Sequence, residues 1–254
     1  MKKRDTELAR YQCTEVVRIG TAGWSIPKIC RPDFREEGTA LEKYAARLNA
    51  VEINSSFYRR HKKSTYEKWA SQVAENFSFS VKLPRSITHQ SRLTNIDEHL
   101  NSFADQIRGL GTKLGCVLVQ LPPSLEFFQP EVKQAFDLMR RTFACSIVCE
   151  PRHESWFSIA ANQFLLETEV ARVAADPTLF ALASLPGGDT RVCYYRLHGS
   201  PDMYYSKYST NDIHNFAELI KGNRPNSQVW CIFDNTANGY ATSNAIAISQ
   251  LLEN

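Results

Sequence analysis

The residues of this sequence best suited to chemistry are charged side chains that directly follow short apolar runs. Four of them can take up or release a proton, and we assign them as candidate catalytic residues: Glu52, Lys82, Glu150 and His198. Two carboxylates with different neighbours can adopt different protonation states, and a histidine can move a proton near neutral pH. This set predicts acid–base chemistry, of the isomerase or hydrolase type, on a small polar substrate.

Other polar and aromatic residues close to the same run ends could bind that substrate. Arg196 provides a fixed positive charge, and glycines let an anion approach the backbone closely. We therefore expect an anion site near Gly199 and Asn235, which would suit a sugar-like or phosphorylated substrate. The complete set of predicted substrate-binding residues is Trp24, Asn54, Tyr58, Gln120, Arg152, Asp176, Arg196, Gly199, Asp234 and Asn235.

A divalent metal is an alternative use of the same side chains. Glutamate, aspartate and histidine are suitable ligands for magnesium, manganese or zinc, and would fit an isomerase or a phosphodiester hydrolase. However, these residues do not follow a known metal-binding spacing, and Lys82 and Arg196 could already neutralise the carboxylates. The identity of any metal therefore stays open.

Three further alternatives remain. Schiff-base chemistry at Lys82 needs a lowered amine pKa, whereas we expect the neighbouring carboxylates to raise it. A binding module without catalysis could stack nucleic-acid bases on aromatic residues such as Tyr204 and Tyr205. Finally, any one of the charged residues could be part of a structural ion pair at the top of the fold.

Composition restricts the class of partner. The 254 residues carry a net charge of +3, which gives little support to nucleic-acid binding, and 43% of them are hydrophobic. The glycines match neither a dinucleotide fingerprint nor a phosphate-binding loop, so we expect no nucleotide cofactor. We expect a small-molecule substrate, and the oligomeric state is not predicted.

The cysteines and the chain start indicate the compartment. The seven cysteines include no Cys-x-x-Cys pair, and most lie within apolar runs, as expected for reduced core residues. Neither an apolar run long enough to cross a membrane nor an export signal is present. These features predict a cytoplasmic protein without membrane contact.

Eight segments have the composition of buried strands, and helical patterns fall between most of them. The predicted strands are 16–20, 50–54, 77–82, 116–121, 145–150, 170–176, 192–198 and 229–234. Leu41, Tyr44, Ala45 and Leu48 show the spacing of one buried helix face. Capping boxes are predicted at Thr39–Glu42 and Ser64–Glu67, and a later helix is expected to end at Gly222.

This alternation predicts one (β/α)8 barrel over residues 1–254, with residues 1–14 as an N-terminal extension. One unit, around residues 177–191, is irregular because it leaves little room for a helix. An open, doubly wound sheet is the alternative. In a barrel, the C-terminal ends of parallel strands meet at one rim, so the polar residues named above are predicted to converge there.

Several of these segments resemble the YecE-like family, an uncharacterised family named for a domain of unknown function. The resemblance rests on GTAGW at 20–24, VEINSSFYR at 51–59, SVK at 80–82 with ITH at 87–89, LVQLPP at 118–123, EPRHESW at 150–156, YRLHG at 195–199 and FDNT at 233–236. Two residues depart from it, since Ala22 replaces a usual serine and Ser56 a usual threonine. Ala22 has lost a hydroxyl and therefore receives no catalytic role.

The resemblance implies a TIM-type barrel. It also implies a relationship to sugar isomerases, and through them to a broader group that includes apurinic-site endonucleases. It does not imply a defined reaction, because the activity of the family is not established.

Overall fold

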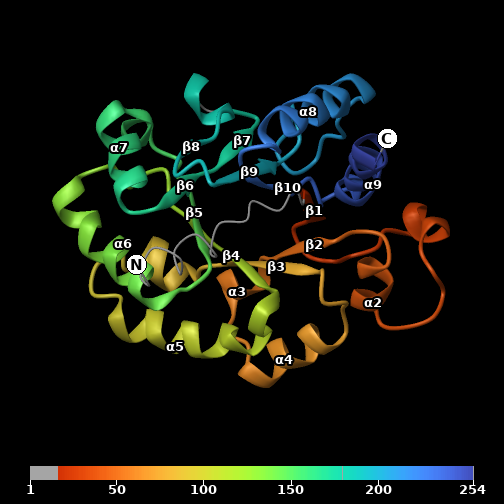
Figure 1. Cartoon of the computed structure of the whole chain (residues 1–254), viewed down its shortest axis with the longest axis horizontal. Coiled ribbons are helices and arrows are strands. Elements are labelled where there is room, and N and C mark those ends of the chain that lie inside the picture. The colour runs from red at the N-terminus through yellow and green to blue at the C-terminus, as the bar shows by residue number, and fades with distance from the viewer. Residues whose placement is uncertain (1–16, 179, 254) are drawn as a thin grey trace, which may run out of the picture.

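The computed structural model describes residues 17–178 and 180–253, so the predicted N-terminal extension lies outside the described residues. Strands and helices alternate along this part of the chain, and Figure 1 shows the helices arranged around a central set of strands. None of its helices is both long enough and apolar enough to span a membrane. The prediction of an α/β fold with parallel strands is confirmed.

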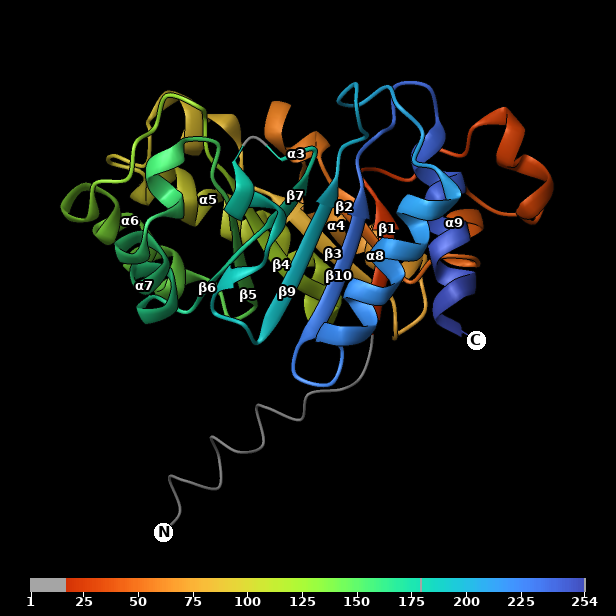
Figure 2. The same ribbon diagram turned by 90° about the horizontal axis from the view of Figure 1, so that it is seen from above.

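The strands form two sheets, and their hydrogen-bonded pairs are parallel except for one. The first sheet has the order β1 (Val17–Thr21), β10 (Gln228–Phe233), β9 (Val192–Leu197) and β7 (Ala174–Asp176). The second has the order β2 (Ala50–Ile53), β3 (Ser78–Lys82), β4 (Leu114–Gln120), β5 (Ser146–Glu150), β6 (Val170–Arg172) and β8 (Gly187–Gly188). Only β6 and β8 are antiparallel. In Figure 2 the arrows of β7, β9 and β10 point the same way, so their C-terminal ends lie on one side.

The predicted strand at 170–176 is divided between the two sheets. Its first part, β6, pairs with β5, and its last part, β7, pairs with β9. Val173 lies between them and donates its backbone N–H to the carbonyl of Cys149. This single segment therefore runs from one sheet into the other, which the pattern of apolar residues did not reveal.

The other edges of the two sheets meet between β1 and β2. A parallel bridge joins Ala22 to Glu52, and the N–H of Gly23 donates to the carbonyl of Glu52 over 2.8 Å. Gly20 permits this approach, because a Cβ at that position would lie 2.1 Å from the carbonyl oxygen of Ala50. A larger residue would push β1 away from β2.

The α-helices lie between the strands in sequence. They are α2 (Ala40–Ala45), α3 (Ser55–Tyr58), α4 (Lys63–Ser71), α5 (Asp97–Ile107), α6 (Gln129–Thr142), α7 (Ile159–Glu167), α8 (Thr210–Asn223) and α9 (Tyr240–Glu253). Short 3-10 or π turns are η1 (Lys28–Asp33), η2 (Ser86–Gln90), η3 (Arg108–Lys113), η4 (Glu154–Phe157) and η5 (Ala181–Ser184). The described residues of the irregular unit at 177–191 form η5 and β8 and contain no α-helix.

Helix boundaries agree with the sequence in part. The capping box of Thr39 and Glu42 is present at the start of α2. The predicted box at Ser64 is wrong, because the cap position of α4 is two residues earlier, at Lys62, which makes no side-chain cap bond. Gly222 does not end α8, since the helix continues to Asn223.

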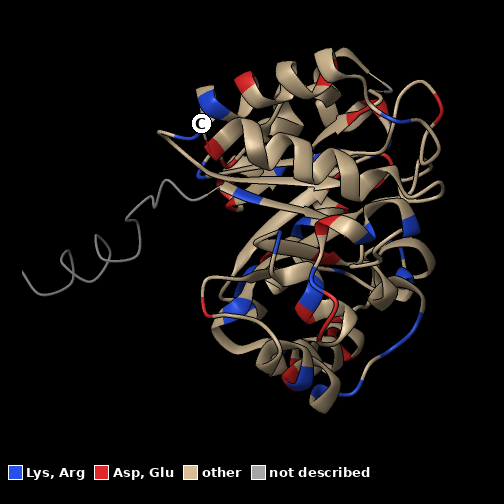
Figure 3. Ribbon diagram, turned by 90° about the vertical axis from the view of Figure 1, so that its right-hand side faces the viewer, with Lys and Arg blue, Asp and Glu red and all other residues tan. Residues whose placement is uncertain are grey.

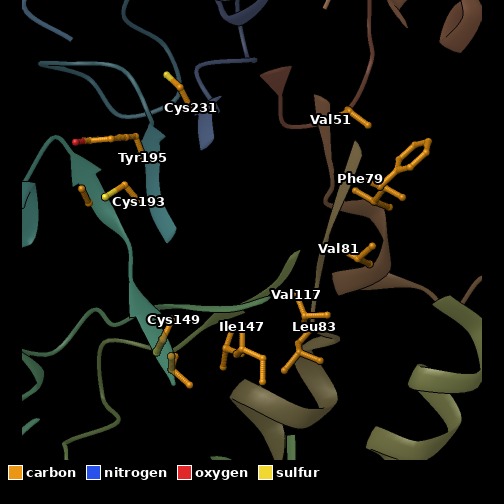
Figure 4. Packing of buried hydrophobic residues seen from close by; sticks show 14 of the residues in the cluster. Val51, Phe79, Val81, Leu83, Val117, Ile147, Cys149, Cys193, Tyr195 and Cys231 are labelled. Atoms are coloured by element: carbon orange, nitrogen blue, oxygen red, sulfur yellow. The ribbon is translucent and has the colours of Figure 1, made fainter. Parts of the chain in front are cut away.

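Buried apolar side chains fall into two groups. The larger group fills the space between strands and helices; in Figure 4 its members Phe79 and Tyr195 point in opposite directions, away from the region between their strands. The smaller group comes from strands and their direct continuations, and includes Leu118, Val148 and Trp230. Alternation along each strand separates the two groups. The described cysteines are all unpaired, and most are buried core residues, as predicted.

Candidate functional site

The guanidinium of Arg196 lies among three carboxylates near the C-terminal ends of four strands. It donates to Glu52 through Nε (3.0 Å to Oε2) and Nη2 (2.7 Å to Oε1). Nη1 lies 2.5 Å from Oε2 of Glu150, and Nη2 lies 2.9 Å from Oδ2 of Asp234. Arg196 and Glu52 are completely buried, and Glu150 is 1% exposed. We call these four residues, with His198 and Arg152, the Arg196 cluster.

His198 directly follows β9 and lies on the same face as Arg196. It bridges two of the carboxylates, Glu150 and Asp234. Its Nε2 lies 3.0 Å from Oε1 of Glu150, and its Nδ1 lies 3.1 Å from Oδ2 of Asp234. The imidazole can donate to both only when both ring nitrogens carry a proton. The ring edge of Tyr204 packs against it at 5.6 Å between centroids. His198 is therefore held on three sides and is fully buried.

Glu150 is the most heavily bonded carboxylate of the cluster. Besides Arg196 and His198, it accepts from Nε of Arg152 at 2.9 Å and from Nε2 of Gln120 at 3.0 Å. Gln120 ends β4 directly opposite Glu150 in the register of β5. The adjacent strand therefore supplies a neutral donor while the loop after β5 supplies the second arginine.

Strand alternation explains why these side chains share one side. Tyr194, Arg196 and His198 are at alternate positions from β9 onward, so they face the same way. The Tyr194 hydroxyl lies 2.8 Å from Oε2 of Glu52 and 2.9 Å from the hydroxyl of Ser80. These bonds form a polar layer directly above the apolar interior, where Tyr194 stacks on Trp230.

The charges in the cluster hold one another in the ionised form. Burial acts to raise the pKa of Glu150, but Arg196, Arg152 and His198 outweigh it and keep that pKa well below the usual value. The pKa of Asp234 is also lowered, because Arg196 and His198 outweigh burial. Burial likewise opposes the charge of Arg196, yet the three carboxylates raise its pKa well above normal. The cluster is thus electrostatically satisfied.

Lys82 ends β3 beside the cluster but does not join its bonds. It is 8% exposed, and its Nζ lies 4.3 Å from the centre of the Phe57 ring. Its amine makes no hydrogen bond or ion pair with the described residues. Lys113 is equally buried, yet its amine donates to the carbonyls of Ala70 and Val73 and pairs with Glu75. Among the described residues, the amine of Lys82 therefore differs from that of Lys113 because it has no hydrogen-bond or ion-pair partner, and not because of its burial.

The pKa of Lys82 is lowered to about 8. Burial is the main cause and the charge of Arg196 the second, and together they outweigh Glu52, Glu150 and Asp234, which raise it. The prediction that the carboxylates would raise this pKa overall is wrong, because burial and the charge of Arg196 outweigh their effect. Lys82 can consequently exchange a proton close to neutral pH.

Three predicted binding residues lie in a separate set of contacts around Tyr208. Its hydroxyl donates to Oδ1 of Asp176 over 2.7 Å, and accepts from the backbone N–H of Gly199 over 2.8 Å. Asn235 is fully buried and donates to the carbonyl of Ser206 and the side chain of Asn244. These bonds occupy the N–H of Gly199 and the side-chain NH₂ of Asn235, which lie at the expected anion site.

Trp24, Asn54 and Tyr58 are also outside the Arg196 cluster. Trp24 packs edge-on against Trp69 and lines an open groove of about 670 Å³ between α2 and α4. Tyr58 is 75% exposed at the end of α3. The side-chain oxygen of Asn54 is buried and has no partner among the described residues.

Of two residues near Lys82, sequence reasoning missed Phe57 and left the role of His89 open between the rim and a local cap. Phe57, in α3, supplies the ring beneath its amine, and the ring of His89, in η2, packs edge-on against Phe57 at 5.0 Å between centroids. Both positions come shortly after a polar strand end, which is the one sequence signal that could have suggested them.

The described residues do not include three His, Cys, Asp or Glu side chains placed together as a metal site. Charges of both signs are spread over the ribbon in Figure 3, with no large region of one sign in this view. The residues of the Arg196 cluster therefore differ from other charged residues in their burial and their ion pairs, more than in net charge.

The chain is similar to known proteins along nearly its whole length. Residues 18–254 match the family described as "Protein of unknown function DUF72". The chain is 33% identical over 107 residues to the UPF0759 protein YecE of Escherichia coli, a match that covers 42% of this chain and only 38% of YecE. It is 23% identical to the UPF0759 protein YunF of Bacillus subtilis, over 94% of this chain and 95% of YunF.

A solved structure supports the same fold. A DUF72 family protein from Enterococcus faecalis superposes with a TM-score of 0.80, over 94% of this chain and 96% of that one. The two sequences are 22% identical, so the likeness concerns the fold alone.

Proposed function

This chain belongs to the DUF72 family of unknown function, and we propose that it is an enzyme that performs acid–base chemistry on a small polar substrate beside Lys82. One observation carries the proposal: Lys82 is a buried amine with no hydrogen-bond or ion-pair partner among the described residues, with a pKa lowered to about 8, next to a fully paired cluster of charges. Perturbed groups of this kind are concentrated at functional sites.

The Arg196 cluster supports this role by positioning and electrostatics. Its three carboxylates are engaged by arginines, so Glu52 and Glu150 are poorly placed to act as free bases. Burial, and after it the charge of Arg196, lowers the pKa of Lys82 to about 8, as a catalytic acid or base near neutral pH requires. We therefore assign proton transfer to Lys82, and positioning to Glu52, Glu150 and His198.

We further propose that the two sheets close into one eight-stranded (β/α)8 barrel. The bridge between Ala22 and Glu52 and the crossing of residues 170–176 between sheets support this arrangement. In such a barrel the C-terminal rim carries the active site, and Lys82, Glu150, His198 and Asp234 would all belong to that rim.

Proton NMR in heavy water tests the reaction class even while the substrate is unidentified. A mixture of sugars, sugar phosphates and small hydroxy acids is incubated with the protein. Loss of a carbon-bound proton signal reports an isomerase, and new product signals report a hydrolase. We expect turnover with the wild type and with the surface variant Lys133→Met, and none with Lys82→Met. The proposal fails if no compound changes, or if Lys82→Met is as active as the wild type.

Schiff-base formation at Lys82 is a second candidate function, and the lowered pKa of its amine favours it. A neutral amine can attack the carbonyl carbon of an aldehyde or ketone, and loss of water then gives the imine. Borohydride adds hydride to this imine and traps it as a stable secondary amine. Mass spectrometry should then find the adduct on the peptide that contains Lys82. Labelling spread evenly over exposed lysines would reject this second function.

A further inference from the structure

We infer that the substrate carries a phosphate-like dianion, bound between Lys82, His89 and Arg152 at the ends of β3 and β5. The inference rests on the proposed function, because it assigns a substrate class to the same site. It differs from the sequence-based anion site, which involved Gly199 and Asn235.

The ring of Phe57 brings the first two groups together. The amine of Lys82 lies 4.3 Å from the ring centre, and the His89 ring meets the same ring edge-on at 5.0 Å. Nδ1 of His89 lies 2.8 Å from the hydroxyl of Thr88, which fixes the orientation of the imidazole. Nε2 of His89 makes no hydrogen bond to the described residues, so it is available to a ligand.

Arg152 approaches from the loop after β5. Its Nε and Nη2 face Glu150, while Nη1 has only a weak contact, at 3.8 Å, with the sulfur of Met203. The N–H groups of Nη1 are fixed in the plane of the guanidinium, so an anion that approaches in this plane could accept from them without loss of the ion pair. The side chain is 14% exposed, which leaves it accessible from the loop side.

Three cationic side chains, Lys82, Arg85 and Arg152, lie near His89. Burial lowers the pKa of His89 first, and the charges of Lys82, Arg85 and Arg152 lower it further. The neighbouring carboxylates all pair with Arg196; they are Glu52, Glu150 and Asp234. His198 also bridges Glu150 and Asp234. Of these cations Arg152 is paired with Glu150, whereas the buried amine of Lys82 has no hydrogen-bond or ion-pair partner among the described residues, and a bound anion would supply one.

The available donors suit a tetrahedral dianion. Lys82 offers three N–H donors, and His89 and Arg152 offer one nitrogen each. The three residues come from β3, from η2 and from the loop after β5. A phosphate monoester has three terminal oxygens and close to two negative charges near neutral pH. A carboxylate, with two oxygens and one charge, would leave part of this set unused.

Isothermal titration with inorganic phosphate tests the site, with sodium chloride used to hold ionic strength constant. We expect binding to the wild type and to Lys133→Met with equal affinity. Removal of a charge-assisted contact should weaken binding about tenfold or more in Lys82→Met and severalfold in His89→Gln. Circular dichroism and urea unfolding verify that each variant is folded, and His89→Gln provides the test if Lys82→Met does not fold.

The result separates this inference from the proposed function. Turnover of uncharged sugars alone, with no phosphate binding, overturns the inference and leaves the function standing. Phosphate binding that depends on Lys82 and His89, without turnover of any compound, supports the inference and overturns the function. Equal phosphate binding in the wild type, Lys82→Met and His89→Gln would show a non-specific ion effect and overturn the site.

Discussion

Arg196 binds Glu52 through two parallel hydrogen bonds, of 3.0 and 2.7 Å, and this pair joins a strand of one sheet to a strand of the other. Both side chains are completely buried. Two-pronged geometry fixes the relative orientation of β2 and β9 as well as their separation. The pair therefore acts as a structural centre from which the side chains of Glu150, Asp234 and His198 are positioned.

Replacement of Arg196 by methionine should strongly destabilise the protein. Three buried carboxylates would lose their common partner, and removal of one member of a buried ion pair typically costs about 3–5 kcal/mol. Urea unfolding at neutral pH measures the change. Arg108→Met is the matched control, because Arg108 pairs with Asp105 on an exposed surface, and its loss should cost less than about 0.5 kcal/mol. Similar losses in the two variants would contradict this account.

The loss of folding stability at acid pH should also depend on Arg196. Glu150 and Asp234 have lowered pKa values in the folded protein, against 4.5 and 3.8 for the ordinary groups. Their contribution to stability is therefore complete above about pH 4.5 and is lost as the pH falls through the lowered values. In Arg196→Met this contribution is absent, so the stability difference from the wild type should narrow between pH 5 and pH 3. A difference that stays constant would contradict the assignment.

Lys82→Met should stabilise the protein at pH 7, in contrast to most core substitutions. The folded pKa is about 8 against 10.5 for an ordinary lysine, so the charged amine is penalised by about 3 kcal/mol in the folded state. This penalty is complete below about pH 8 and disappears as the pH rises to about 10.5. The charges that face the amine are Arg196, Glu52, Glu150 and Asp234.

The measurement compares urea unfolding of Lys82→Met and the wild type from pH 7 to pH 10.5. The advantage of the variant should decrease over this interval. The comparison with the wild type cancels the titration of buried tyrosines and cysteines, which both proteins share. A variant that is destabilised at pH 7 by more than about 1 kcal/mol would show that the amine has a stabilising partner.

Gly20→Ala should weaken the junction between β1 and β2. The added Cβ would lie 2.1 Å from the carbonyl oxygen of Ala50, and neither backbone can move without strain. We expect a loss of about 2–3 kcal/mol in thermal or urea unfolding. Gly222→Ala is the control: its Cβ meets nothing within 4 Å, and alanine in a helix should be neutral or stabilising by up to about 1 kcal/mol. Equal tolerance of both changes would argue against a tight junction.

The sequence correctly predicted where a side chain lies when its position depends on local strand geometry. Alternation along β9 correctly placed Arg196 and His198 on one face, and the polar strand end at Glu150 lies beside them. It did not predict that Asp176 would turn to Tyr208, because that tyrosine belongs to a loop 32 residues later. The strand at 170–176 shows the same limit, since its division between two sheets depends on partners and not on its own composition.

The pKa of Lys82 could not be predicted from the sequence, for a related reason. A set of nearby carboxylates suggested a raised pKa, whereas burial and the charge of Arg196 outweigh those carboxylates and lower it. Phe57 was missed and the role of His89 was left open, because Phe57 contacts Lys82 from a short helix and His89 contacts Phe57 from a turn. Such contacts are set by tertiary packing, which hydrophobic periodicity does not encode.

Glu150→Gln distinguishes a structural carboxylate from one that is held in a strained state for function. The carboxylate accepts bonds from Arg196, Arg152, His198 and Gln120, and a glutamine would point its NH₂ group at one side of this donor set. We expect a loss of about 3 kcal/mol, as for other buried ion pairs broken on one side.

Asp176→Asn is the comparison, because this carboxylate accepts only from Tyr208 among the described side chains, and an amide oxygen can replace it. Its loss should be about 1 kcal/mol or less. Catalytic residues held against their own preference usually give neutral or stabilising variants when they are replaced. A Glu150→Gln variant that is as stable as the wild type would therefore move Glu150 from the positioning residues to the reacting groups, and Lys82 would then be its proton-transfer partner.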